Sequence, residues 1–376
     1  MVDNLLKYKI GIEMIPKIGS VNAKKLIAYC GGVEAVFKQS KKALLKIPGI
    51  GNCLASEIAN QKVIGVAEKE VEFIEKFNIK PLFYLDAEYP ERLRQCEDSP
   101  IVLFIKGKNE INFNQEKYIS IVGTRKATDY GRAICEKLIY GLVEKGYSPV
   151  IVSGLAYGID ITAHKVALKN NLITLAILGH GLDIIYPVSH RNIAKDIIET
   201  GALLTDFPSK TKFDRNNFIK RNRIIAGLSD ATIVIESGSE GGALITADLA
   251  NSYNREVFAV PGNVGAKYSE GCNQLIKSNK AALVETSDDI EYFLGWEPKN
   301  IQKQPKQIVL FSELSEDEKR VVAYLKEVDQ ESIDMLSIKI QLPVSKISSL
   351  LLNLEFAGVI KCKPGKVYSL SVKDKH

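Results

Sequence analysis

Hydrophobic residues in the first 80 positions recur at intervals of three and four, as in NAKKLIAYC (22–30) and VEFIEKF (71–77). No stretch of this region alternates between apolar and polar residues as a half-buried strand would. The pattern therefore predicts a helical domain over residues 1–80.

Two similar phrases lie within this helical region, IPKIGSVNAKKL (15–26) and IPGIGNCLASEI (47–58). Each places a short turn with proline and glycine before a helix. Glycine frees the turn, and backbone N–H groups at a helix start can face a phosphate. The phrases resemble tandem helix-hairpin-helix motifs, which hold nucleic-acid backbones without reading sequence. A helical bundle with a purely structural role is the alternative interpretation.

The pattern changes after residue 80. A short β region spans residues 81–106, and continuous apolar runs then alternate with helical patterns, one of which ends at Gly146. The alternation predicts a parallel sheet covered by helices on both faces, an α/β doubly wound, Rossmann-like domain over residues 81–296. The runs expected to form its strands are 118–123, 149–154, 172–178, 202–207, 231–237, 256–262 and 281–285.

The C-terminal part begins with a stretch rich in proline, glutamine and lysine at residues 297–311, which is typical of a linker. Residues 312–376 follow with a serine-glutamate helix start, two further helical patterns and a hairpin with Pro-Gly at its turn. Three helices and a β-hairpin predict a winged-helix domain.

Composition narrows the class of protein. The chain has 376 residues, 45% of them hydrophobic and 25% charged, with a formal net charge of +5, as in ordinary soluble globular proteins. The six cysteines are scattered without a CxxC pair, and the four histidines lack ligand spacing, so we expect core cysteines in a reducing cytosol and no metal. We also expect no signal peptide, no membrane span and a cytoplasmic location.

Positive charge is concentrated in one segment. Between residues 210 and 223 there is one acid, Asp214, and the local charge of +5 equals that of the whole chain. The segment contains six basic residues, Lys210, Lys212, Arg215, Lys220, Arg221 and Arg223.

Three glycine turns join this basic segment in the predicted sheet: IVGTRKATDYG, VSGLAYGID and ESGSEGGALITADLA each follow a strand. Ligands in open α/β sheets bind at the carboxyl ends of strands, where helix N-termini attract phosphate. None of the turns is a GxGxxG fingerprint or a Walker loop, so a generic NAD or ATP site is disfavoured and we expect no cofactor.

Four phrases in order, IVGTR, SGLAYGIDITAH, NFIKRNRIIAGLSDATIVIES and GSEGGALITADLA, resemble the DNA-processing protein A family, also called DprA or Smf. AVPGN and GCNQLI follow in the expected places. The likeness covers the central domain almost end to end. It extends to the flanks, since family members often carry an N-terminal helix-hairpin-helix or sterile-alpha-motif-like domain and a C-terminal winged helix.

The resemblance implies a protein that binds single-stranded DNA entering a transforming cell, protects it and helps to load the RecA recombinase. It implies a homodimer that is not an enzyme, so no catalytic residue is assigned. Carried onto this sequence, the pocket uses Arg125, Arg215, Phe218, Arg221 and Asn222, lined by Gly238, Ser239 and Gly242. The predicted DNA-binding set also includes Gly123, Lys220 and Arg223.

Physical chemistry agrees with these roles. Arginine and lysine attract phosphate in a salt-dependent manner. Phe218 can stack a base, worth about 1–3 kcal/mol, and Asn222 can bond a base edge. Alternatively, Phe218 is a core aromatic, and Asn222 and Arg223 only cap or brace the helix.

Two other functions remain open. Nucleotide-processing phosphoribohydrolases of the wider superfamily pair an arginine with a glutamate just after a PGGxGT turn; here Glu240 lies inside the turn and Asp248 well into the helix. A regulatory or adaptor protein would use the winged helix. The expected recognition helix there, LPVSKISSLLLNLEFAG, has Lys346 as its one positive residue, which favours a packing role.

Overall fold

The structure is a computed structural model. The chain folds into two compact units, Met1–Asn300 and Ile301–His376. Each unit is described by itself. The residues that the structure describes are 4–108, 111–114, 117–297, 314–328, 330–357, 359–363 and 367–370.

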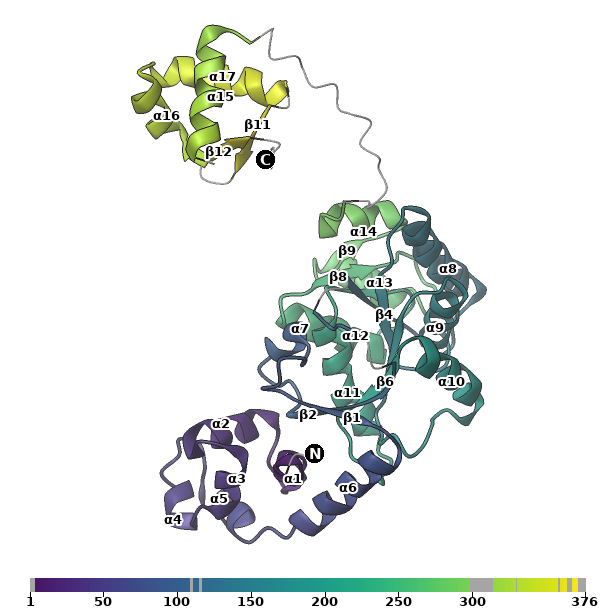
Figure 1. Cartoon of the computed structure of the whole chain (residues 1–376). Coiled ribbons are helices and arrows are strands. Elements are labelled where there is room, and N and C mark those ends of the chain that lie inside the picture. The colour runs from purple at the N-terminus through teal and green to yellow at the C-terminus, as the bar shows by residue number, and fades with distance from the viewer. Residues whose placement is uncertain are drawn as a thin grey trace. The chain divides into compact units, whose positions relative to one another are not determined.

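The first unit begins with helices, as predicted (Figure 1). The two hairpin phrases open α2 and α5, whose N-caps are Gly19 and Gly51. Lys25 of α2 donates to the carbonyl of Pro48 at 2.9 Å, so the second hairpin turn rests on the helix of the first. The helices are α1 (Leu6–Met14), α2 (Ser20–Cys30), α3 (Val33–Lys38), α4 (Lys41–Leu44), α5 (Asn52–Ala59) and α6 (Ile64–Lys76).

A mixed, mainly parallel sheet forms the centre of the first unit. In the described part of the chain it has nine strands in the order β1-β2-β6-β5-β4-β3-β7-β8-β9. Every run predicted to be a strand forms one. The strands are β1 (Lys80–Phe83), β2 (Val102–Gly107), β3 (Tyr118–Val122), β4 (Val150–Ser153), β5 (Thr174–Ile177), β6 (Ala202–Thr205), β7 (Ala231–Val234), β8 (Glu256–Ala259) and β9 (Ala282–Leu283).

The edge of the sheet formed by β1 and β2 was not foreseen from the sequence. β1 pairs with β2, and β2 with β6, both antiparallel, whereas the pairs from β6 to β9 are parallel. The short β region is therefore an extension of the main sheet. Apolar side chains of Phe83, Val102 and Phe104 pack into the core of the N-terminal helices, so this edge joins the two parts of the unit.

Helices cover both faces of the sheet, which confirms the doubly wound class (Figure 1). Side chains at successive strand positions enter different cores: Val122 packs with α11 and α12, and Ile121 with α8 and α9. The helices are α7 (Glu91–Arg94), α8 (Asp129–Glu144), α9 (Ile159–Lys169), α10 (Arg191–Thr200), α11 (Arg215–Leu228), α12 (Gly242–Ser252), α13 (Glu270–Lys277) and α14 (Ser287–Leu294), with a 3₁₀ turn η1 (Val188–His190).

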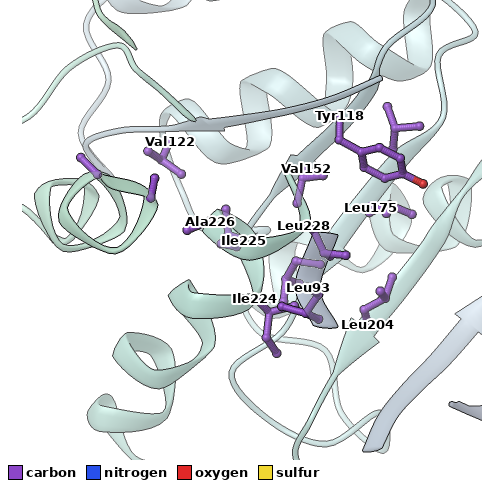
Figure 2. Packing of buried hydrophobic residues seen from close by; sticks show 14 of the residues in the cluster. Leu93, Tyr118, Val122, Val152, Leu175, Leu204, Ile224, Ile225, Ala226 and Leu228 are labelled. Atoms are coloured by element: carbon purple, nitrogen blue, oxygen red, sulfur yellow. The ribbon is translucent and has the colours of Figure 1, made fainter. Parts of the chain in front are cut away.

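The C-terminal half of α11 is anchored in the largest core. Figure 2 shows its apolar residues beside strand residues Val122, Val152, Leu175 and Leu204. Ile224 and Ala226 are both fully buried, which fixes the position of the whole helix against the sheet. The polar N-terminal half is thereby held at the carboxyl edge of the strands.

The second unit is a winged-helix domain, as predicted. Its first helix starts with a capping box, in which Ser315 and Glu318 bond each other's backbone N–H groups. The predicted linker at 297–311 lies, apart from Glu297, outside the described residues. The elements are α15 (Glu316–Val328), β10 (Gln330–Ser332), α16 (Ile333–Ile340), α17 (Val344–Phe356), β11 (Ile360–Lys363) and β12 (Val367–Leu370).

Two further expectations concern the whole chain. Cys96, Cys135 and Cys272 are buried as expected and Cys30 is half-buried, but Cys53 and Cys362 are exposed, so the prediction of core cysteines was wrong for these last two. Within the described residues, no single helix has the length and apolarity to cross a membrane; only the bent pair of α16 and α17, at 110°, passes on length and composition together.

Candidate nucleic-acid interface

A cavity of about 430 Å³ lies where β3 and β7 end. These neighbouring strands mark the point at which the sheet changes its direction of growth, since β4 to β6 extend one way from β3 and β7 to β9 the other. Ligands of doubly wound sheets bind in the crevice at such a point. The loop after β3, the first turns of α9 and α11 and the start of α12 supply the cavity wall.

The loop after β3 is held tightly. A Cβ at Gly123 would collide with the side chain of Ile159, and Gly158, at φ 76°, lies against the backbone of Thr124 and Arg125. The amide of Thr124 also donates to the carbonyl of Glu236 at 2.6 Å. This packing requires the glycines and presents the side chain of Arg125 as an exposed residue of the cavity wall.

The basic segment forms the first turns of α11. Asp214 caps the helix by accepting from the amide of Asn216 at 2.8 Å, so the segment's one acid is used by the backbone. Arg215 follows, exposed at the cavity wall. Asn222, about two turns further along, is half-buried and donates to the carbonyl of Gly242 at 3.5 Å, which links α11 to α12.

Phe218 stands between the sheet and the cavity. Its ring is half-buried and lines the cavity, and the guanidinium carbon of Arg125 lies 6.0 Å from the ring centre. A Cβ at Gly179 would touch the ring, so the close approach of this glycine lets Phe218 settle against the end of β5. Phe218 therefore combines a packed side with a side on the cavity.

Arg221 is buried, with 3% of its surface exposed. One guanidinium nitrogen donates to the carbonyls of Gly154, at 2.9 Å, and Ile177. Burial lowers the pKa of Arg221 to about 10, against the effect of the nearby Asp160 carboxylate. Burial also raises the pKa of Asp160, and the charge of Arg221 opposes that rise. Arg221 thus lines the buried side of the cavity, connects the strand ends there and retains its charge at neutral pH.

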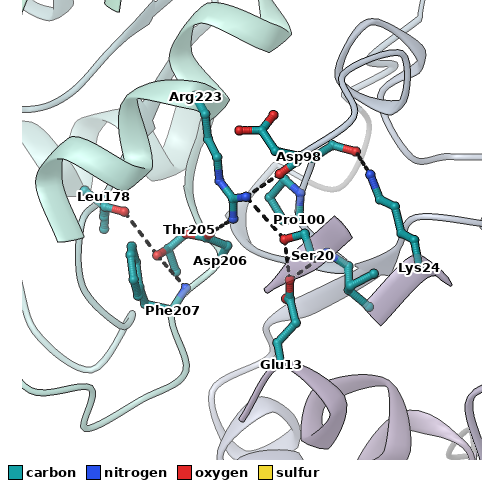
Figure 3. Close-up of polar contacts among 12 residues, drawn as sticks. Glu13, Ser20, Lys24, Asp98, Pro100, Leu178, Thr205, Asp206, Phe207 and Arg223 are labelled. Carbon is teal, nitrogen blue, oxygen red and sulfur yellow. Dashed lines mark hydrogen bonds and ion pairs between the residues drawn. The ribbon is translucent and has the colours of Figure 1, made fainter. Parts of the chain in front are cut away.

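Arg223 faces away from the cavity, towards the N-terminal helices (Figure 3). It forms an ion pair with Asp206 at 2.7 Å and donates to the hydroxyl of Ser20 at 3.2 Å and to the carbonyl of Asp98. The same serine donates to Glu13 at 2.6 Å, and burial raises the pKa of this glutamate. Arg223 therefore connects α11 to α1, α2 and the segment before β2.

The remaining predicted residues lie either at this cavity or at a second cleft on the other side of α11. Gly238 and Gly242 line the cavity, and a Cβ at Gly242 would meet no atom within 4 Å, so the N-terminus of α12 is open there. Ser239 is exposed in the same turn and does not line the cavity. Lys220 lines a different, larger cleft of about 840 Å³, together with Arg223.

The expected basic cluster is therefore only partly exposed, because helical periodicity places Arg221 on the same face as Ile225 and Leu228. The described residues include no carboxylate paired with Arg125, Lys212 or Arg215. The cavity wall also contains two acids, Asp160 and Glu240.

Sequence reasoning missed two aromatic residues of the cavity wall, Tyr186 and Phe213. Tyr186 lies in the loop after β5, and Phe213 precedes the cap of α11. An aromatic residue within the basic segment was a usable signal for Phe213. Tyr186 had none, because only the fold brings its loop to α11.

His164 is fully buried, and its Nδ1 lies 2.7 Å from the hydroxyl of Thr174. Among the described residues, no group of three or more histidine, cysteine or acidic side chains is arranged to hold a metal.

The sequence profiles of two families match the chain. The family described as DNA recombination-mediator protein A matches residues 80–295, and the DprA winged helix domain matches residues 311–366. Protein Smf of Synechocystis is 31% identical over 98% of this chain and 99% of its own length.

Two solved structures are also similar. DNA processing protein A from Streptococcus pneumoniae has 30% identity and a TM-score of 0.63, covering 77% of this chain and 98% of its own. DNA processing protein A from Helicobacter pylori, described for its single-stranded DNA binding mode, has 27% identity and a TM-score of 0.52, covering 58% of this chain and 96% of its own.

Proposed function

The chain belongs to the DNA recombination-mediator protein A (DprA/Smf) family, and from this premise we propose that it binds single-stranded DNA in the cavity at the carboxyl ends of β3 and β7. The observation that carries the proposal is the meeting of Arg125, Arg215 and Phe218 in one cavity wall. Two exposed cations beside a partly open aromatic ring match a strand whose phosphates and bases are both accessible.

A single strand suits this cavity better than a duplex. The bases of a duplex are stacked on one another and expose only their edges in the grooves, so Phe218 would have no base face to contact. A continuous exposed helix that could enter a major groove is also lacking in the described cavity wall, because α11 is buried from Ile224 onward. We therefore propose binding with little sequence dependence.

The predicted residues contribute in two ways under this proposal. Arg125, Arg215 and Phe218 contact the strand, with Gly238 and Gly242 allowing its backbone to approach the N-terminus of α12. Asn222 holds α12 against α11, and Gly123 lets the Arg125 loop pack closely. Arg221 and Arg223 act from inside the protein, through the position of α11. Lys220 attracts the strand from outside the cavity, where the exposed hydroxyl of Ser239 can offer a hydrogen bond.

We further propose that the protein protects incoming DNA during transformation and helps to load RecA, as a cytoplasmic homodimer. The family relationship supports this part, since the family description is that of a recombination mediator. Two pockets on one assembly would raise the avidity for long strands. Light scattering at micromolar concentration tests the dimer, and a monomer mass would rule it out.

The proposal includes no catalysis. Asp248 forms an ion pair with Lys280 at 2.9 Å and does not line the cavity, and Glu240 precedes the N-cap of α12. Neither position supports the arginine-glutamate pair of a phosphoribohydrolase. Incubation with nucleoside monophosphates should give no hydrolysis.

The direct test is a titration with single-stranded and blunt duplex oligonucleotides over a series of salt concentrations. We expect tighter binding of the single strand at every salt concentration and a decline in affinity as salt rises. Equal affinity for the duplex at the same salt would contradict the proposal.

A further inference from the structure

Two side chains outside the predicted set, Tyr186 and Phe213, form a three-ring cluster with Phe218. The ring centres lie 4.8 Å apart for Tyr186 and Phe213, 5.2 Å for Phe213 and Phe218, and 5.9 Å for Tyr186 and Phe218. The pairs Tyr186–Phe213 and Phe213–Phe218 pack edge to face, a favoured geometry for aromatic rings, at 68° and 64°, and the pair Tyr186–Phe218 is tilted at 57°. The three rings thus form one aromatic surface along the cavity wall.

Two rings of the cluster are open to solvent. Phe213 is 49% exposed and Tyr186 is 41% exposed, whereas Phe218 is only half-buried between them and the sheet. Aromatic rings contribute most when their faces are covered, so rings left open at a cavity are suited to a ligand with flat apolar faces. Nucleobases have such faces whatever their sequence.

The charge around the cluster indicates a strand of nucleic acid as the occupant. Lys212 and Arg215 flank Phe213 in sequence and are exposed, and Arg125 lies at the Phe218 ring. In the described part of the chain these three cations have no ion-pair partner. A protein partner of apolar character would bury them at a cost, while a strand would bring one phosphate for each base.

We propose that Tyr186 and Phe213 form a second stacking position, so that the cavity holds two neighbouring bases of one strand. The first base lies on Phe218 beside Arg125, and the second lies on the exposed rings of Tyr186 and Phe213. Lys212 and Arg215 then neutralise phosphates on the side of the second base. This inference rests on the proposed function and adds to it the length and composition of the binding site.

The experiment compares Tyr186→Leu, Phe213→Leu and Tyr186→Phe with the unaltered full chain, by anisotropy with labelled oligothymidine longer than the cavity. Leucine keeps an apolar contact for Phe218 but cannot stack a base. Tyr186→Phe keeps the ring and removes only the hydroxyl. Tyr29→Leu is the matched control, because Tyr29 is a 60% exposed ring on α2, outside the cavity wall.

Each of Tyr186→Leu and Phe213→Leu should weaken binding by about 5- to 150-fold, the equivalent of one lost stacking contact, without changing the salt slope. Tyr29→Leu should bind like the unaltered chain, and Tyr186→Phe should bind more tightly than Tyr186→Leu, because it keeps the ring that stacks the base. An oligonucleotide with two adjacent 2-aminopurines should be quenched at both positions by the unaltered chain and at only one by Tyr186→Leu. Thermal melting of each variant records its stability.

The possible results separate this inference from the proposed function. If the unaltered chain fails to bind the oligonucleotide, the proposed function itself is wrong. If Phe218→Ala weakens binding while both leucine variants bind normally, only the second stacking position is wrong. If the leucine variants bind weakly but melt earlier and leave both 2-aminopurines quenched, the rings support Phe218 by packing alone and the inference is overturned.

Discussion

The guanidinium carbon of Arg125 lies 6.0 Å from the centre of the Phe218 ring, although 93 residues separate the two in sequence. The contact joins the loop after β3 to the first turns of α11, across the point where the sheet changes direction. A phosphate on Arg125 would therefore place the adjoining base near the ring. Under the proposed function, charge and stacking would act on neighbouring parts of the same nucleotide strand, and single substitutions can separate them.

Arg125→Ala should weaken single-strand binding strongly and leave the fold intact, because the side chain is exposed. Each lost phosphate contact should also reduce the slope of log affinity against log salt by about 0.7. Binding titrations over a salt series measure both effects. Lys126→Ala is the control, because Lys126 is the cation next to Arg125 in sequence and is exposed, but it does not line the cavity. Normal affinity with an unchanged slope for Arg125→Ala would place the binding site elsewhere.

Phe218→Ala should weaken single-strand binding by about 1–3 kcal/mol with little change in the salt slope, since stacking releases no counterions. The ring is half-buried, so the substitution also removes packing against the end of β5. Binding and thermal melting must therefore be measured together. A loss of thermal stability with unchanged binding would make Phe218 a core residue, which is the alternative that the sequence left open.

The sequence predicted the secondary structure well because each element has a local signal. The buried runs around Ile121 and Ile233 are continuous and apolar, and the α8 pattern ends at Gly146, whose φ is 81°. The antiparallel edge had no such signal. β2 pairs with β6 almost 100 residues later, and this pairing depends on the N-terminal helices that cover Phe104.

The candidate site was harder to predict because a count of charges ignores direction. Arg221 and Arg223 are two positions apart, and on a helix they face different sides. Arg221 lies on the same helix face as the buried residues Asn217 and Ile225, whereas Arg223 points to Asp206. Applying the helical period to the apolar residues of α11 would have identified Arg221 as buried. The partners of Arg223 lie in distant segments and needed the structure.

Stability should depend on pH through His164. This side chain is fully buried, and burial lowers its pKa from 6.5 to about 3. Between these values the folded protein binds fewer protons than the unfolded chain, so stability is full above pH 6.5 and declines as pH falls towards 3. The thermal midpoint of His164→Leu should fall less steeply with acid than that of the unaltered chain. Lys165→Ala, an exposed neighbour on α9, should keep the original dependence. Identical pH profiles for His164→Leu and the unaltered chain would exclude this histidine as the acid-sensitive group.

Arg223→Met should destabilise the first unit, because it leaves the carboxylate of Asp206 buried without its ion-pair partner. Removing one member of a buried pair costs about 3–5 kcal/mol, and the double variant Arg223→Met with Asp206→Asn should regain part of that loss. Chemical denaturation measures both. Lys220→Met on the same helix is the control, since Lys220 is exposed and has no ion-pair partner among the described residues.

The binding titration then identifies the role of Arg223. We expect Arg223→Met to keep the salt slope of the unaltered chain, because the guanidinium is occupied by Asp206, Ser20 and Asp98 and releases no counterion from DNA. If the variant instead remained fully stable and its salt slope fell, Arg223 would contact the strand directly, as the sequence first indicated.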